Sequence, residues 1–197
     1  MSITQIVTLA VLALLIFWSV GAYNRLVRLR NAITNAFAQI DVQLKRRHDL
    51  IPNLVEVARK YLEHERDTFE RVTAARNQAI AACDLVRARP GQPGPVKSLG
   101  LAEEVLASAM KGFNAVVEAY PELQADETMQ RLSEELTHTE NKVAFARQLF
   151  NDATMDYNNA AQEFPANVLA GLFGFKEAPM LQSTGSDIER APVKVGF

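Results

Sequence analysis

The chain begins with an uncharged apolar stretch from Ile3 to Ala22. Only a few small or polar residues interrupt it: Thr4, Gln5, Thr8, Ser19 and Gly21. About 20 such residues are enough for one helix to cross a bilayer. The stretch therefore predicts a transmembrane anchor over residues 1–22, with Trp18 and Tyr23 near the membrane surface, and everything after it should lie beside a membrane.

A cleaved signal peptide and a buried core helix are the alternatives to a retained anchor. A signal peptide needs a basic start and a small-residue cleavage site, and neither Met1–Gln5 nor the bulky Ile16–Trp18 supplies them. A core helix of a small domain would have a polar face. Arg25, Arg28 and Arg30 follow the stretch, and because basic flanks stay in the cytoplasm, we expect the N-terminus outside and the body in the cytoplasm.

Composition bounds the function of the body. The roughly 175 residues after the anchor suit a single domain. A net charge of −2 argues against nucleic acid as a partner, and the single cysteine, Cys83, excludes an internal disulfide and a multi-cysteine metal site. No phosphate-binding glycine loop or nucleophile motif is present in the sequence. We therefore expect no enzyme, no cofactor, no small-molecule substrate, and no catalytic or metal-binding residues.

Apolar residues at steps of three and four predict helices throughout the body. The first runs from Asn24 to Arg47, continuous with the anchor. Asp49 as an N-cap and Pro52 in a first turn predict a turn and then a second helix that fades near Arg87. Its buried stripe would comprise Leu54, Val57, Tyr61, Phe69, Val72, Ala75 and Ala79.

The second half of the body predicts two more helices. Residues 89–95 hold three prolines and two glycines and predict a loop. A third helix is expected from about Lys97 to Tyr120. A fourth should start after the cap Asp126 and end before Pro165. Its seam is the most regular: Met129, Leu132, Leu136, Thr139, Val143, Ala146, Phe150, Ala153, Tyr157, Ala160 and Phe164.

No segment alternates with the period of a strand, so the expected fold is all-α. The simplest arrangement is an antiparallel four-helix up-down bundle over residues 23–165. At ~1.5 Å per residue, the second and fourth helices would outreach the others by roughly 20 Å, so the bundle has ragged ends or a helix breaks earlier.

The remaining residues 166–197 form an apolar segment and an irregular tail containing Pro179, Gly185, Pro192 and Gly196. The fourth helix runs back toward the bilayer. We therefore expect the uncharged stretch Phe164–Phe175 either against the membrane surface or as a cap on the bundle.

One feature suggests a metal-binding alternative. Glu135 and His138 form a Glu-x-x-His pair, but a ferritin-like di-metal bundle needs two such pairs. His48 and His64 have no glutamate three positions before them. A metal-binding bundle or oxidase is therefore a weaker hypothesis than a protein without a metal.

Polar residues crowd the fourth helix: Glu140, Asn141, Arg147, Asn151, Asp152, Asn158 and Asn159. A solvated face with a few register-setting hydrogen bonds is the favoured explanation. The alternative is a polar groove that receives a peptide or a partner helix.

Several blocks of sequence resemble the bacterial LemA family. In the first half they are Tyr23-Asn24, Leu29–Asn31, Gln39–Arg47, Asp49–Glu56 and His64-Glu65. In the second half they are Glu118–Pro121, Glu134–Leu136, Thr139–Asn141, Ala144–Arg147, Phe150–Asp152, Tyr157-Asn158, Phe164-Pro165 and Phe173–Phe175. The resemblance implies a single-pass protein of the bacterial cell membrane with its N-terminus out, a helical-bundle body and no established enzymatic activity.

The leading functional hypothesis is a membrane-tethered scaffold or adaptor. Its partners would be the lipid bilayer and either other membrane proteins or further copies of itself. A signalling module that answers envelope stress by helix shifts is a third hypothesis, and the sequence does not separate it from the first.

Overall fold

The structure, a computed structural model, describes residues 2–62 and 64–181, and all regular secondary structure in this part of the chain is helical. The all-α prediction is confirmed. The helices are α1 (Ile3–Arg59), α2 (Arg66–Ala88), α3 (Pro93–Ala119), α4 (Pro121–Gln124), α5 (Glu127–Gln162) and α6 (Ala166–Phe173).

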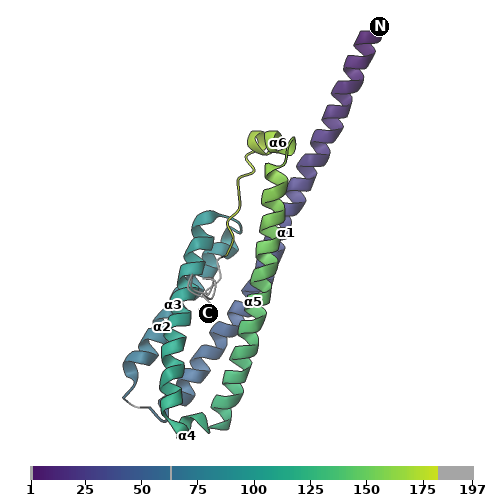
Figure 1. Ribbon diagram of the computed structural model, residues 1–197. Helices are drawn as coiled ribbons and strands as arrows, with labels where there is room; N and C mark the ends of the chain where they lie inside the picture. The colour runs from purple at the N-terminus through teal and green to yellow at the C-terminus, as the bar shows by residue number, and fades with distance from the viewer. Residues whose placement is uncertain (1, 63, 182–197) are drawn as a thin grey trace, which may run out of the picture.

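Helix α1 is both the apolar anchor and a core helix of the body (Figure 1). Its 57 residues make a rod about 85 Å long at ~1.5 Å per residue. No residue in the most apolar window of α1 is buried, and α1 is the one described helix that is long and apolar enough to cross a membrane. Burial begins at Leu26, and from Ile33 to His48 one side chain every three or four residues is buried. The anchor thus enters the bundle without a break.

The body is a bundle of two helix pairs: α1 packs mainly against α5, and α2 mainly against α3. Short α4 turns the chain at the end farthest from the anchor (Figure 1). The buried side chains form three clusters along the bundle, centred on Phe113 at the far end, on Phe150 in the middle and on Leu26 where the anchor emerges. The predicted four-helix bundle is therefore present.

The predicted turn at Asp49 is wrong. Helix α1 continues through Pro52 to Arg59, and the turn lies between Lys60 and Glu65. A proline inside a helix removes the hydrogen bond to the carbonyl four residues earlier, here that of His48. Arg76 of α2 supplies the missing donor, with its Nε 2.5 Å from the His48 oxygen.

This longer α1 also changes which helices are long, because the expected second helix breaks at the turn after Arg59. Leu54 and Val57, assigned to a second helix, are buried on α1 instead. The structure therefore pairs two long helices, α1 and α5, with two shorter ones, α2 and α3.

The connection between α2 and α3 is shorter than predicted. Helix α3 begins at Pro93, within the expected loop of residues 89–95. Proline at the start of a helix costs no hydrogen bond, because the first N–H groups have no partner inside the helix. The true connection, Arg89–Gln92, includes Gly91 at φ 79°, a left-handed conformation that glycine adopts without strain.

Helix α5 matches its prediction closely. The Asp126 carboxylate accepts hydrogen bonds from the backbone N–H groups of Thr128 and Met129 at 2.8 and 2.9 Å, which confirms it as the N-cap. The predicted seam is buried, with Ala153 half-buried. Its last member is an exception, because Phe164 lies beyond the helix and is 83% exposed.

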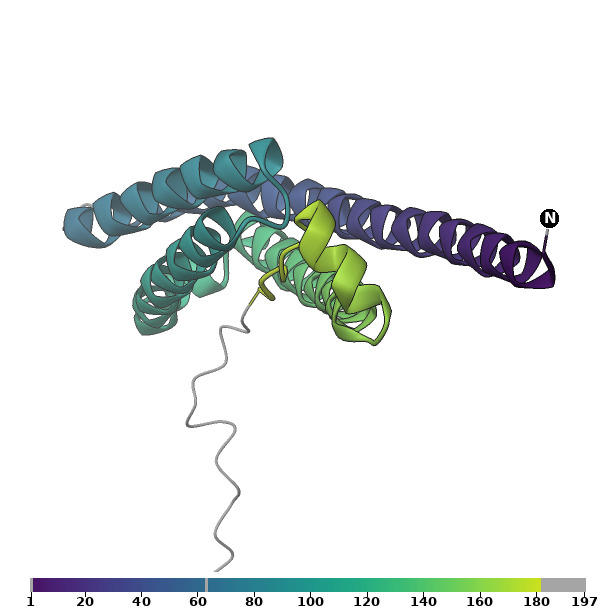
Figure 2. The ribbon, with the colours of Figure 1, turned by 90° about the horizontal axis from the view of Figure 1, so that it is seen from above.

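The chain after α5 crosses the end of the bundle and then turns back. Seen from above, α6 lies across the end of α5 beside α1 (Figure 2). Gly174, at φ 70°, ends α6 in the left-handed conformation. Residues 175–181, which we call the strap, then run without helix or strand along the bundle, and Ala178 and Leu181 join the middle core cluster. The predicted tail residues Gly185, Pro192 and Gly196 lie outside the described residues.

Candidate functional site

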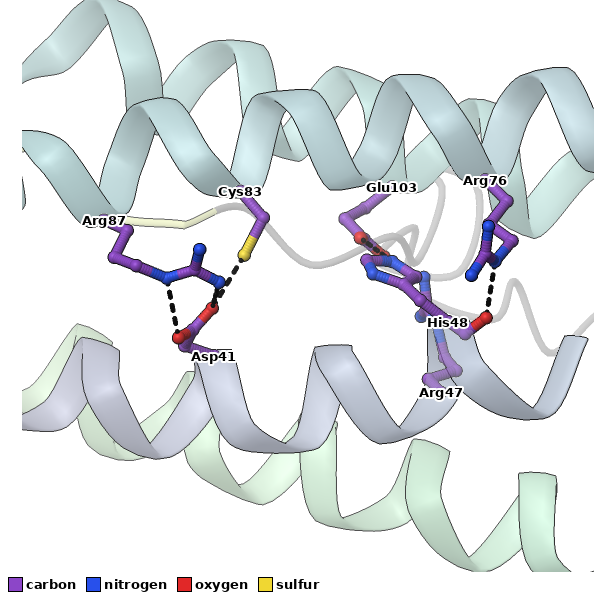
Figure 3. A network of polar contacts seen from close by, with 7 residues as sticks. All are labelled: Asp41, Arg47, His48, Arg76, Cys83, Arg87 and Glu103. Carbon is purple, nitrogen blue, oxygen red and sulfur yellow. Dashed lines mark hydrogen bonds and ion pairs between the residues drawn. The ribbon is translucent and has the colours of Figure 1, made fainter.

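A buried charged cluster links α1 and α3 in the middle of the bundle (Figure 3). His48 and Arg47 on α1 approach opposite oxygens of Glu103 on α3, with His48 Nε2 3.2 Å from Oε1 and Arg47 Nη2 paired with Oε2. The side chains of Arg47, His48 and Glu103 are only 11%, 4% and 8% exposed. Neither Arg47 nor Glu103 was singled out from the sequence, because each lies in an ordinary run of charged residues.

The carboxylate of Glu103 is held in its charged form. Burial on its own would raise the pKa of Glu103, but the hydrogen bond with His48 and the positive charge of Arg47 outweigh it, so the pKa is lowered. A buried charged pair of this kind adds little net stability, but removing one partner is costly because the other charge is left buried and unpaired. The cluster therefore fits a structural role between α1 and α3.

Arg147 of α5 borders the same cluster. It lines a cavity of about 220 Å³ together with Arg47, Glu103, Glu140 and Leu181. Burial and the nearby charge of Arg47 lower the pKa of Arg147. Within residues 2–62 and 64–181 no ion pair is formed by Arg147.

A second polar cluster surrounds the single cysteine (Figure 3). Cys83 on α2 donates from Sγ to Asp41 Oδ1 at 3.1 Å, and Arg87 binds both oxygens of Asp41 at 2.6 and 3.0 Å. The hydrogen bond from Arg87 lowers the pKa of Asp41. Burial, and then Asp41, raises the pKa of Cys83 to about 12. A thiol that stays protonated is a poor nucleophile, so the cluster ties α1 to α2 rather than activating the cysteine.

The residues of the metal-binding alternative do not assemble into a site. Glu135 pairs with Arg46 at 2.6 Å, and His138 is exposed. Across the part of the chain that the structure describes, no three histidine, cysteine or acidic side chains come close enough to hold a metal ion.

Two of the polar residues on α5 hold the strap. Asn158 Oδ1 accepts from the backbone N–H of Ala178 and its Nδ2 donates to the carbonyl of the same residue, both at 2.9 Å. Asn151 binds Leu181 in the same way at 2.8 and 3.0 Å. Tyr157 adds a bond from its hydroxyl to the Lys176 carbonyl at 2.9 Å.

The spacing of the two asparagines matches an extended peptide. Asn151 and Asn158 are seven residues apart, about 10.5 Å along a helix at ~1.5 Å per residue. Ala178 and Leu181 are three residues apart, about 10 Å along an extended chain at ~3.3 Å per residue. Asn151 and Asn158 therefore bind the chain's own tail, and the groove for a peptide or partner helix considered from the sequence stays a prediction. The sequence signal for this polar contact is the pair of asparagines two turns apart, but nothing in the sequence identifies the tail as their partner.

Aromatic contacts join the tail to the base of the anchor. The ring of Tyr23 lies edge-on to those of Phe173 and Phe175, at centroid distances of 5.0 and 5.5 Å. Next to them, Arg25 pairs with Glu163 at 3.5 Å. Helix α6 is thus fixed at the level where the apolar run of α1 ends.

Three known proteins are similar to this chain over most of its length. MamQ 2, a magnetosome protein of Paramagnetospirillum magneticum, is 25% identical over 183 residues, covering 81% of this chain and 64% of the relative. MamQ of Magnetospirillum gryphiswaldense is 26% identical over 177 residues, covering 78% of this chain and 62% of the relative. Protein LemA of Metamycoplasma hominis is 25% identical over 177 residues, covering 90% of this chain and 75% of the relative. The chain thus spans less than two thirds of the length of the two MamQ proteins.

The family comparison agrees with these relatives. The LemA family is matched over residues 36–197, a range that includes most of the buried part of α1, all of the later helices and the strap. Together with the apolar anchor helix, this match describes a membrane-associated helical protein. The resemblance noted from the sequence is confirmed, and the chain belongs to the LemA family.

Proposed function

We propose that this protein is a membrane-tethered scaffold or adaptor that acts by binding further copies of itself or other membrane proteins. The observation that carries the proposal is the unbroken helix α1. It holds the exposed apolar anchor and the buried centre of the bundle in one rod. A body attached in this way keeps a fixed height and angle relative to the bilayer, as a scaffold requires.

The surface of α5 supports self-association. Phe145 and Leu149 lie one turn apart and are 65% and 42% exposed. Side chains four residues apart share a helix face, so the two form one apolar strip. Val42, on the neighbouring α1, is 62% exposed. Apolar side chains grouped in this way on a folded surface are typical of protein contacts.

Self-association can be tested with the full-length protein in nanodiscs or vesicles. Energy transfer between labelled copies should report assemblies larger than a monomer. Replacing Phe145 and Leu149 together by glutamate should abolish the transfer, because it places charge in the apolar strip. Leu101→Glu is the matched control, since Leu101 is an equally exposed leucine on α3. Strictly monomeric wild-type protein, or equal loss in the control, would contradict self-association; if no membrane protein then co-purified in mild detergent, the scaffold proposal itself would fail.

The orientation in the membrane is part of the proposal. Arg25, Arg28 and Arg30 are all exposed at the base of the anchor, which supports a cytoplasmic body by the positive-inside rule. Protease added to intact cells should leave the body uncut, whereas inverted membrane vesicles should lose it. Cleavage of the body from outside intact cells would reverse the assignment.

A further inference from the structure

Helix α6 carries no charge, and Asn167 is its one polar side chain. One face packs on the bundle: Ala170 is buried with Leu26 and Ala160, and Leu169 is half-buried. On the opposite face, Val168 and Leu172 lie one turn apart and are 56% and 75% exposed. Phe173, whose ring touches Tyr23 on one side, is still 60% exposed. Capping of the bundle end therefore accounts for half of this helix only.

Phe164 extends the uncovered face. It lies just before α6 and is the most exposed large apolar side chain of the body, at 83%. Four large apolar side chains within ten residues thus face outward at one end of the molecule. Contiguous apolar surface of this kind marks a contact with a protein or a membrane.

The position of α6 indicates that this contact is with the membrane rather than with a protein. Tyr23, the residue after the apolar run of α1, contacts Phe173 through its ring. Figures 1 and 2 show α6 crossing the bundle at the end from which the anchor emerges. A bilayer crossed by residues 3–22 therefore has its surface at the level of α6.

Charges near α6 match a lipid surface. The exposed side chains of Arg28, Arg30 and Lys176 lie close to the end of the anchor or of α6 in the chain. The nearby acidic residues are fewer: Glu163 pairs with Arg25, and Glu177 follows Lys176. Cations beside an apolar helix face are the usual pattern of elements that lie in the headgroup region, where they meet lipid phosphates.

We infer that Phe164, Val168, Leu172 and Phe173 form a second membrane contact, inserted into the headgroup region of the bilayer that α1 crosses. The protein then meets the membrane at two places that are far apart in sequence and adjacent in space. The strap, held by Asn151 and Asn158, keeps α6 against the bundle. The bundle is consequently fixed in rotation about the anchor as well as in height.

Tryptophan fluorescence of the full-length protein in nanodiscs tests this contact. Trp18 is the single tryptophan, so Leu172→Trp in a Trp18→Phe background reports on α6 alone. Lipids brominated near the headgroup end of their acyl chains should quench the tryptophan at position 172, compared with the same lipids without bromine. Val168→Trp is a second reporter on the same face and should behave alike. Circular dichroism checks that each variant is folded.

Two controls separate the possible outcomes. Phe145→Trp in the same background, on an equally exposed site about 25 Å along α5 from its end at ~1.5 Å per residue, should not be quenched. The native Trp18 should be quenched in wild-type protein, which verifies the anchor independently. Quenching at Trp18 without quenching at positions 168 and 172 would overturn the inference while leaving the anchor and the proposed scaffold intact. A blue-shifted but unquenched signal at position 172 would also overturn it, because it would indicate a protein partner on this face.

Discussion

The guanidinium of Arg76 on α2 donates a hydrogen bond to the backbone carbonyl of His48 on α1 (Figure 3). That carbonyl is the one left without a donor by Pro52, four residues later in the same helix. A side chain from the neighbouring helix thus supplies the hydrogen bond that the proline cannot donate. The same His48 binds Glu103 of α3 through its ring, so one residue of α1 contacts both shorter helices.

This arrangement predicts that Arg76 and Pro52 are energetically coupled. Arg76→Met should lower the free energy of unfolding by about 2 kcal/mol, because it leaves a half-buried carbonyl without a donor. In a Pro52→Ala background, the alanine N–H can bond to His48, and Arg76→Met should then be nearly neutral. Urea unfolding of the four proteins of this double-mutant cycle, in detergent, measures the coupling.

Arg71→Met is the control for that cycle. Arg71 is exposed and bonds within its own helix, to the Asp67 carbonyl. Its replacement should have the same small effect with or without Pro52. Equal losses for Arg76→Met in both backgrounds would show that the bond to His48 does not compensate for the proline.

The missed turn at Asp49 explains which features the sequence can predict. The seam and cap of α5 are local, since a spacing of three and four residues and an aspartate before the helix carry all the information needed. Pro52 is different, because local rules place a proline at the start of a helix. Here the carbonyl that Pro52 leaves without a donor is bound by an arginine 24 positions later in the chain. The strap escaped prediction for the same reason. Asn151 and Asn158 signal a polar contact, but their partners become neighbours only after α6 and Gly174 reverse the chain.

Glu103 should make stability depend on pH on the acid side. Its pKa is lowered from an ordinary value of 4.5, so its stabilising effect is complete above that pH and is lost as the pH falls through the lower pKa of the folded protein. Glu103→Gln should reduce this acid dependence. It should also lower stability at neutral pH by about 3 kcal/mol, because Arg47 loses its buried partner.

Unfolding measured from neutral to acid pH tests this prediction, with a substitution at the neighbouring Glu104 as the control. Glu104 is exposed one position later on α3, and Glu104→Gln should leave both the stability and its pH dependence as in the wild type. A Glu103→Gln protein whose stability falls with acid as steeply as that of the wild type would place the titrating groups elsewhere.

Cys83 should resist alkylation in the folded protein. Burial, together with the hydrogen bond to Asp41, raises the pKa of its thiol to about 12, and only the thiolate reacts quickly. Iodoacetamide should therefore label Cys83 slowly at neutral pH and rapidly in urea. Because burial is the larger cause, Asp41→Asn should speed labelling much less than unfolding does. Fast labelling of the folded wild type, followed by mass spectrometry, would contradict the buried position.

The strap should detach from α5 when the asparagine that holds it is replaced. Asn158→Ala removes both hydrogen bonds to Ala178 and leaves the N–H and carbonyl of a buried residue unpaired, a loss of about 1–3 kcal/mol. Hydrogen–deuterium exchange should then rise in residues 175–181, while α2 and α3, which Asn158 does not bond, keep their protection. Asn159→Ala is the matched control, since Asn159 is the exposed neighbour. If exchange in the strap stayed slow, Ala178 and Leu181 would hold it by apolar packing alone, and the asparagine pair would not be what fixes α6 beside the membrane anchor.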